Sequence, residues 1–171
     1  MKWFAPTLWD LLGFRKKKPH QAIEPKQKPS VQKPAQTPMR MRYDALVDEM
    51  KRTYGIRVRK WRSSSSGCAW VVRYDNGDER RLIESPYPKG PMSCAIFLHE
   101  VGHHAIGFGT YRPRCLEEFY AWQWALQTMR AKGLNVTAGV EKRVADSLRY
   151  AVQKAKRRGL KNVPEQLSAY V

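Results

Sequence analysis

The stretch "CAIFLHEVGHHAIGF", residues 94–108, carries the strongest structural and chemical signal in the sequence. His99 and His103 stand four residues apart, and in an α-helix residues with this spacing lie on the same face, one turn apart. Glu100 lies about 100° further around the helix axis. The two imidazoles can therefore bind one metal ion, while the carboxylate between them is placed to hydrogen-bond a water molecule at that ion. The pattern His-Glu-x-x-His thus predicts two metal ligands and a general base on one helical turn.

The residues around this motif predict that the helix is buried. They are almost entirely apolar, and Gly102 lies within the helix, although glycine destabilises a helix by about 1 kcal/mol relative to alanine. We interpret Gly102 as a point at which another element approaches closely. The alternative, a buried helix with two structural histidines, leaves Glu100 as a buried charge without a use. We therefore prefer the metal site.

A catalytic zinc ion needs a third protein ligand and an open coordination position. Glu117 and Glu118 open the next predicted helix, after a loop with Gly109 and Pro113 that can turn this helix back across the first. Either glutamate is a candidate ligand. The other is expected to stabilise the N-terminus of its helix through the helix macrodipole.

The side chains that share a helical stripe with each glutamate favour Glu118. Its stripe continues through Ala121, Trp122 and Ala125, and the two alanines allow close approach to the face that bears the histidines. The stripe of Glu117 carries two bulkier aromatic side chains. The predicted Zn²⁺ ligands are therefore His99, His103 and Glu118.

Two further side chains near the motif have competing interpretations. Cys115 precedes the glutamates and would give a closed, structural zinc site if it bound the metal. A small packed thiol is the preferred interpretation of this cysteine. His104 lies four residues after Glu100 and can contact it or orient a ligand, but we leave it outside the predicted catalytic set.

The two motifs together resemble a known family. "HEVGH" followed by "EFYAWQWA" is similar to the gluzincin metallopeptidases, and its layout is closest to the small ImmA/IrrE-type proteases and to membrane peptidases of the same clan. The resemblance implies that His99 and His103 are zinc ligands, that Glu100 is the catalytic glutamate and that Glu118 is the zinc glutamate. Trp122 departs from the family pattern, because Asp or Asn usually stands there as a partner of the metal ligands.

The resemblance covers about residues 92–130 and implies a zinc metallopeptidase that acts on a protein or peptide substrate. In such an enzyme Glu100 takes a proton from the zinc-bound water as it attacks the peptide carbonyl, and then delivers the proton to the leaving amine. The oxyanion needs a further donor, for which Tyr111, Tyr120 and Arg114 are candidates by residue type. The alternative function is a catalytically inactive, basic zincin-like adaptor that binds nucleic acid or an anionic membrane surface.

The remaining sequence patterns predict an α+β fold, which agrees with the minimal zincin-like domain that the resemblance implies. An amphipathic helix ends at Gly55, "IRVRKWR" alternates like a strand, and the Asn-Gly in "CAWVVRYDNGDERRLIES" predicts a hairpin. Three helices should follow at about 92–106, 115–132 and 137–158. We thus expect an N-terminal helix, a small antiparallel sheet, the motif helix and two further helices. An edge strand near "CAWVVRY" or "RRLIE" is expected to bind an extended peptide by strand addition.

The last of these helices has one apolar stripe, and lysine and arginine occupy the opposite face. The stripe consists of Val140, Val144, Leu148 and Val152. A stripe of this kind predicts one buried side and one solvent-facing side.

Composition divides the chain into an apolar, aromatic segment (1–14), a basic Pro/Lys/Gln-rich linker expected to be disordered (15–40) and a folded domain (41–171). The net charge is +17, which predicts contact of the tail and the C-terminal helix with nucleic acid or an anionic membrane. The three cysteines form no CxxC pair, and we find neither a signal-peptide pattern nor a membrane span. We expect a cytoplasmic protein that can lie peripherally at a membrane through residues 1–18.

Overall fold

A computed structural model describes residues 37–171, so the predictions for residues 1–14 and for most of the linker lie outside the described residues. The elements follow one another along the chain as α2 (Pro38–Tyr54), β1 (Ile56–Arg62), β2 (Cys68–Arg73), β3 (Glu79–Pro86), α3 (Pro91–Ile106), α4 (Arg114–Ala131), α5 (Ala138–Arg157) and the short 3₁₀ helix η1 (Glu165–Tyr170). This order confirms the predicted α+β class, with a helix, three strands and then three helices.

Helix α2 begins three residues before the predicted domain boundary. Thr37 caps it by accepting a hydrogen bond from the Arg40 amide at 3.3 Å, and Pro38 occupies its first turn. A threonine cap followed by proline is a favoured start of a helix. Here these two residues lie in the proline-rich stretch that was predicted to be a linker, so the sequence did not indicate a helix start. Gly55, with a φ of 62°, ends the helix as predicted.

The sheet has the strand order β1-β3-β2. The predicted hairpin of β2 and β3 is confirmed, and its turn is closed by the Gly77 amide, which donates to the Tyr74 carbonyl at 2.9 Å. The expectation of an antiparallel sheet is wrong for β1, which pairs in parallel with β3. The connection at residues 63–67 can span about 16 Å when extended, enough to pass over β3 and place β2 on its far side. The stretch "RRLIE" is therefore central, and β2 is an edge strand.

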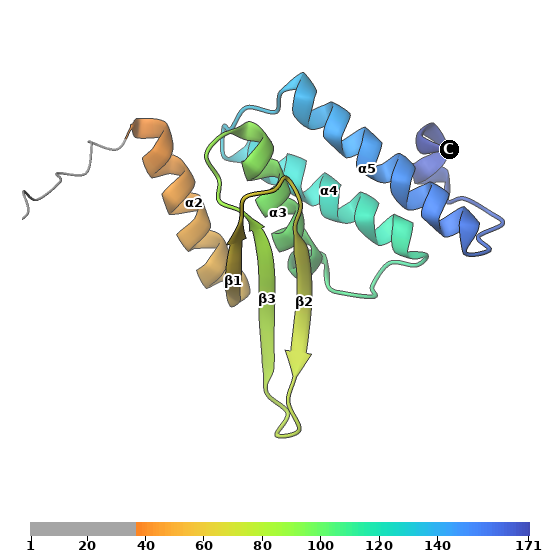
Figure 1. Cartoon of the computed structure of the whole chain (residues 1–171), viewed down its shortest axis with the longest axis horizontal. Helices are drawn as coiled ribbons and strands as arrows, with labels where there is room; N and C mark the ends of the chain where they lie inside the picture. The colour runs from red at the N-terminus through yellow and green to blue at the C-terminus, as the bar shows by residue number, and fades with distance from the viewer. Residues whose placement is uncertain (1–36) are drawn as a thin grey trace, which may run out of the picture. The chain divides into compact units, whose positions relative to one another are not determined.

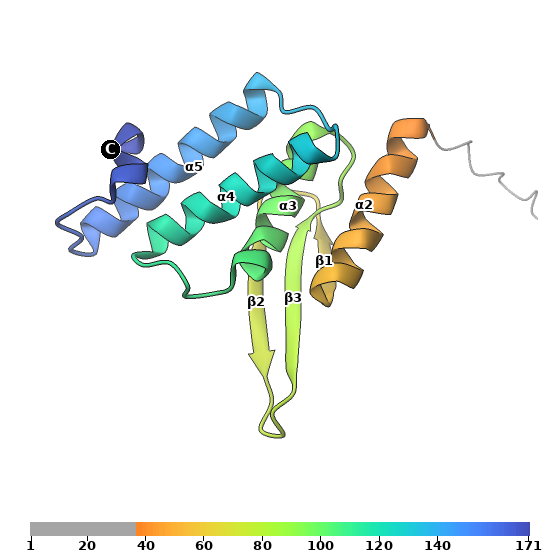
Figure 2. The ribbon, with the colours of Figure 1, turned by 180° about the vertical axis from the view of Figure 1, so that it is seen from behind.

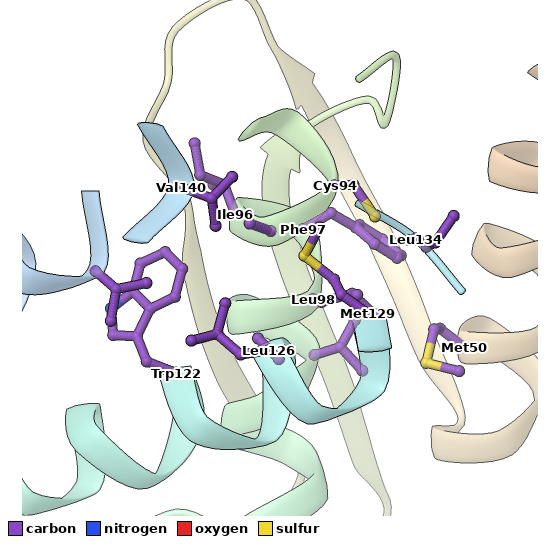
Figure 3. Packing of buried hydrophobic residues seen from close by; sticks show 14 of the residues in the cluster. Met50, Cys94, Ile96, Phe97, Leu98, Trp122, Leu126, Met129, Leu134 and Val140 are labelled. Carbon is purple, nitrogen blue, oxygen red and sulfur yellow. The ribbon is translucent and has the colours of Figure 1, made fainter. Parts of the chain in front are cut away.

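Helix α3 lies on one face of the sheet, and α4 crosses α3 on the side away from the strands (Figures 1 and 2). Helix α2 packs against β1 and α3, while α5 packs against α4. Figure 3 shows the core between them, where Phe97 and Leu98 of α3 meet Leu126 and Met129 of α4. The predicted stripe of α5 is confirmed, because all four of its apolar residues are buried.

The crossing of α3 and α4 is close at Gly102, as the sequence predicts. A Cβ atom at this position would lie 2.7 Å from the Ala121 carbonyl oxygen and 3.3 Å from the Ala121 Cα. Ala121 itself is fully buried. This contact fixes the start of α4 over the face of α3 that bears the two motif histidines.

None of the helices within residues 37–171 is long and apolar enough to cross a membrane.

Candidate metal centre

His99, His103 and Glu118 converge at the crossing of α3 and α4. Each offers one ligand atom, and the three atoms lie within 4.8 Å of one another. The Nε2 atoms of His99 and His103 lie 3.3 Å and 3.5 Å from Oε2 of Glu118. Two ligand atoms that bind one tetrahedral zinc ion at about 2.1 Å are separated by about 3.4 Å. These two separations fit a metal ion, such as zinc, held between the imidazoles and the carboxylate.

The sequence explains why these three side chains meet. The four-residue spacing places both histidines on one face of α3, and Gly102, on the same face, allows α4 to approach. The two histidines are buried, with His99 7% exposed and His103 3% exposed, whereas Glu118 is partly exposed. The structure thus brings together the three side chains that the sequence analysis selected as metal ligands.

Glu117 contacts a candidate metal ligand, whereas the sequence predicted only that it would stabilise the N-terminus of its helix. It is 2% exposed, and its Oε1 atom lies 3.3 Å from Nδ1 of His103. Both of these atoms are buried and lack a regular hydrogen bond within residues 37–171. The Gly109 amide donates to the other carboxylate oxygen at 2.8 Å. A carboxylate behind a histidine ligand orients the ring and raises its basicity, so Glu117 is suited to support His103.

His99 is held in a different way, by the ring of Trp122. The two rings stack with their centroids 4.0 Å apart and an angle of 15° between their planes, and Trp122 is 3% exposed. Nδ1 of His99 is buried and has no hydrogen-bond partner among the described residues. Stacking on Trp122 is therefore the contact that holds the ring of His99.

The charge states of His99 and Glu118 suit metal binding, whereas a protonated His103 would have to lose its proton when a metal binds. Burial lowers the pKa of His99 to about 4, which leaves its imidazole neutral, the form that binds a metal. Burial opposes ionisation of Glu118, but the two imidazoles outweigh it and lower the pKa of this carboxyl. Burial also disfavours the imidazolium of His103, while the carboxylate of Glu118 raises the pKa of this histidine above its ordinary value. Glu118 is therefore a carboxylate aimed at two ring nitrogens.

Glu100 is buried next to the cluster and forms no ion pair with a described cation. It is 5% exposed, and the loop before β2 lies directly against it: a Cβ atom at Gly67 would be 2.4 Å from Oε1 of Glu100. Burial raises the pKa of Glu100 to about 7; His103 lowers this pKa to a smaller extent, and the carboxylate of Glu118 adds to the increase. A carboxyl group with a pKa near neutrality is well suited to take up and return a proton.

The other side chains considered from the sequence do not join the group. His104 places Nε2 at 3.1 Å from the Leu82 carbonyl oxygen and so ties α3 to β3. Cys115 is buried in the core and lies outside the metal-ligand group. Tyr111 and Tyr120 stack on each other with centroids 4.0 Å apart. Arg114 donates from Nε to Oε1 of Glu118 at 3.1 Å, which orients that carboxylate.

A cavity of about 750 Å³ opens beside the triad. His99, Glu118 and Trp122 line it on one side, and α5 contributes Arg143 and Lys154. The sequence places lysine and arginine on the side of α5 opposite its apolar stripe, and in the structure Arg143 and Lys154 line the cavity. One polar face of this helix could be recognised from the sequence, because its residues recur at helical spacing: Arg143, Ser147, Tyr150 and Lys154. Periodicity does not reveal which neighbouring element such a face meets.

Comparison of the chain with protein-family models, with curated proteins and with solved structures found no match.

Proposed function

We propose that this protein is a zinc-dependent peptidase that hydrolyses peptide bonds in a protein or peptide substrate. The observation that carries the proposal is the His99, His103 and Glu118 group, whose ligand atoms lie within 4.8 Å of one another, with Glu100 buried beside it. A structural zinc site would have no use for Glu100. The resemblance of "HEVGH" and "EFYAWQWA" to the gluzincins supports the same activity.

His99, His103 and Glu118 would hold the zinc ion, and Glu117 would fix the ring of His103. When bound, zinc polarises the carbonyl of the scissile peptide and acidifies water. Glu100 acts as the base: its carboxylate accepts a proton while the water oxygen forms a bond to the carbonyl carbon. Glu100 then gives this proton to the nitrogen as the carbon–nitrogen bond breaks, which releases an amine and a carboxylic acid, and the acid passes its remaining proton to the amine or to solvent.

Strand β2 supports the binding of an extended substrate. It is one of the two edge strands of the sheet, and it begins directly after Gly67, which lies against Glu100. Its free backbone groups can pair with a peptide by strand addition. A peptide bound there would pass close to the proposed base.

The second candidate function is a basic adaptor with an inactive site, and two observations favour it. Trp122 replaces the polar residue of the family pattern, and the chain carries a net charge of +17. An adaptor would bind nucleic acid or anionic vesicles in a salt-dependent way and would not cleave peptides.

The test is a search for new peptide termini. A proteome-derived peptide mixture is incubated with zinc-loaded wild type, with Glu100→Gln and with Glu165→Gln, a matched change at an exposed position in η1. We expect cleavage by wild type and Glu165→Gln, and a loss of about 100-fold or more in Glu100→Gln with zinc content unchanged. No cleavage by zinc-loaded wild type, or equal cleavage by Glu100→Gln, would contradict the peptidase proposal.

A further inference from the structure

One wall of the cavity beside the metal triad is made of cations. Arg143 and Lys154 of α5, and Arg158 directly after it, line the cavity together with His99 and Glu118. Helix α5 packs against α4, which carries Glu118 (Figures 1 and 2). The same cavity therefore connects the proposed reaction centre to a basic wall.

These three cations have no carboxylate partner within residues 37–171. The acid on the cavity-facing part of α5, Asp146, is already paired with Lys142 at 2.6 Å and with Arg149 at 3.0 Å. Lys154 lies 5.8 Å from the ring centroid of Tyr150. The positive charge that lines the cavity is thus not neutralised by the fold itself.

Arg143 is the most constrained of the three. Its Nη2 atom donates to the Ser65 carbonyl at 3.0 Å, which fixes the guanidinium against the loop before β2. Its Nε atom is buried and has no hydrogen-bond partner among the described residues. Burying a charged donor without a partner is unfavourable. A guanidinium held in this way is prepared to bind a carboxylate, which matches its planar set of donors.

The rest of the cavity wall favours a peptide over a nucleic acid as the ligand. Ile96, Trp122, Ala151, Ala155 and Leu160 add apolar surface between the cations. A pocket with apolar walls and a few convergent polar groups is typical of a site that encloses a compact ligand. Nucleic-acid backbones are instead bound by extended basic surfaces or grooves.

We propose that this cavity binds an acidic side chain of the substrate next to the scissile peptide bond, with Arg143 as the specificity-determining residue and Lys154 and Arg158 as supporting cations. This inference rests on the proposed peptidase function, because the metal triad at the other side of the cavity defines where the peptide bond lies.

Binding tests the inference without relying on turnover. The protein is the full chain carrying Glu100→Gln, loaded with zinc. The probes are two fluorescent decapeptide pools that are identical except for a central Glu in one and Gln in the other. We expect the Glu pool to bind about ten-fold more tightly, and Arg143→Gln to remove most of this difference. Arg157→Gln, an identical charge change at an exposed position of the same helix, should preserve it.

Two additional measurements keep the test decisive. Thermal unfolding establishes that each variant is folded, and Arg143→Lys, which retains the charge, should keep part of the preference for the Glu pool. Equal binding of the two pools, or an equal loss in Arg157→Gln, would overturn the inference. Arg143-dependent binding of a single-stranded oligonucleotide with higher affinity than the Glu pool would also overturn it, in favour of a nucleic-acid site.

Cleavage by the zinc-loaded wild type separates this inference from the proposed function. Cleavage sites enriched in Asp or Glu next to the scissile bond would support both. Cleavage without an acidic preference would overturn the inference and leave the peptidase proposal intact. Charge-selective binding without any cleavage would support recognition of an acidic segment and contradict the peptidase activity.

Discussion

The contact at Gly102 gives a quantitative test of how the fold assembles the metal centre. In Gly102→Ala, the new Cβ atom would lie 2.7 Å from the Ala121 carbonyl oxygen and 3.3 Å from both Ala121 Cα and a ring carbon of Trp124. Ordinary contacts begin near 3.4 Å, so α4 would have to move outward by several tenths of an ångström. Because Ala121 lies one turn after Glu118, this shift would also move the carboxylate ligand away from the histidines.

Two opposing terms set the size of the effect. Alanine gains about 1 kcal/mol over glycine from helix propensity, whereas overpacking a close backbone contact costs about 1–3 kcal/mol. The backbone atoms of Ala121 cannot rotate away like a side chain, so we expect the upper part of that range. The net loss in the free energy of unfolding should be about 1–2 kcal/mol. Zinc affinity should fall by about ten-fold or more, because metal–ligand distances must be met to within a few tenths of an ångström.

Urea unfolding of the metal-free protein measures the first quantity, and competition with a zinc chelator measures the second. Gly139→Ala is the matched control, because it also lies within a helix but its Cβ atom would have its nearest neighbour at 3.7 Å. This control should be at least as stable as wild type and should bind zinc normally. A Gly102→Ala protein with unchanged stability and unchanged zinc affinity would refute the close-approach argument.

Two further predictions concern buried groups. Glu117→Gln should remain folded but bind zinc about 10–100-fold more weakly than wild type in a chelator competition, because the partner of His103 loses its charge; unchanged affinity would remove the supporting role of Glu117. Burial raises the pKa of Cys94 to about 12 from an ordinary value of 9. Its contribution to stability should therefore be complete below about pH 9 and decrease as the pH rises toward 12, by about 2 kcal/mol at pH 10.5. Urea unfolding at pH 8 and 10.5 should show this decrease in the free energy of unfolding of wild type and a smaller decrease in Cys94→Ala. Identical decreases in the two proteins would contradict a raised pKa of Cys94.

Features encoded within one helix or one turn could be predicted from the sequence. The spacing of His99 and His103, the glycine at the helix crossing and the Asn-Gly turn each depend on residues that are close along the chain. Helix geometry and turn preferences translate them directly into structure. Glu118 could likewise be selected over Glu117, because the alanines on its stripe lie within the same helix.

Features that depend on which elements meet could not be predicted in this way. The parallel pairing of β1 with β3 follows from the path of the connection across the sheet, which no local pattern specifies. Glu117 reaches His103 only because α4 crosses α3 at a particular angle. Arg143 lies on a helix face whose periodicity predicts exposure, and only the packing of α5 against α4 turns that face toward the cavity.

The claim that His99, His103 and Glu118 form one metal site is tested most directly by metal content. Purified wild type, repleted with zinc and dialysed, should contain about one zinc ion per chain by elemental analysis. His99→Ala, His103→Ala and Glu118→Ala should each lose it, whereas Glu165→Ala should retain it. Wild type without stoichiometric metal, or a Glu118→Ala protein with zinc bound as tightly as in wild type, would contradict the site.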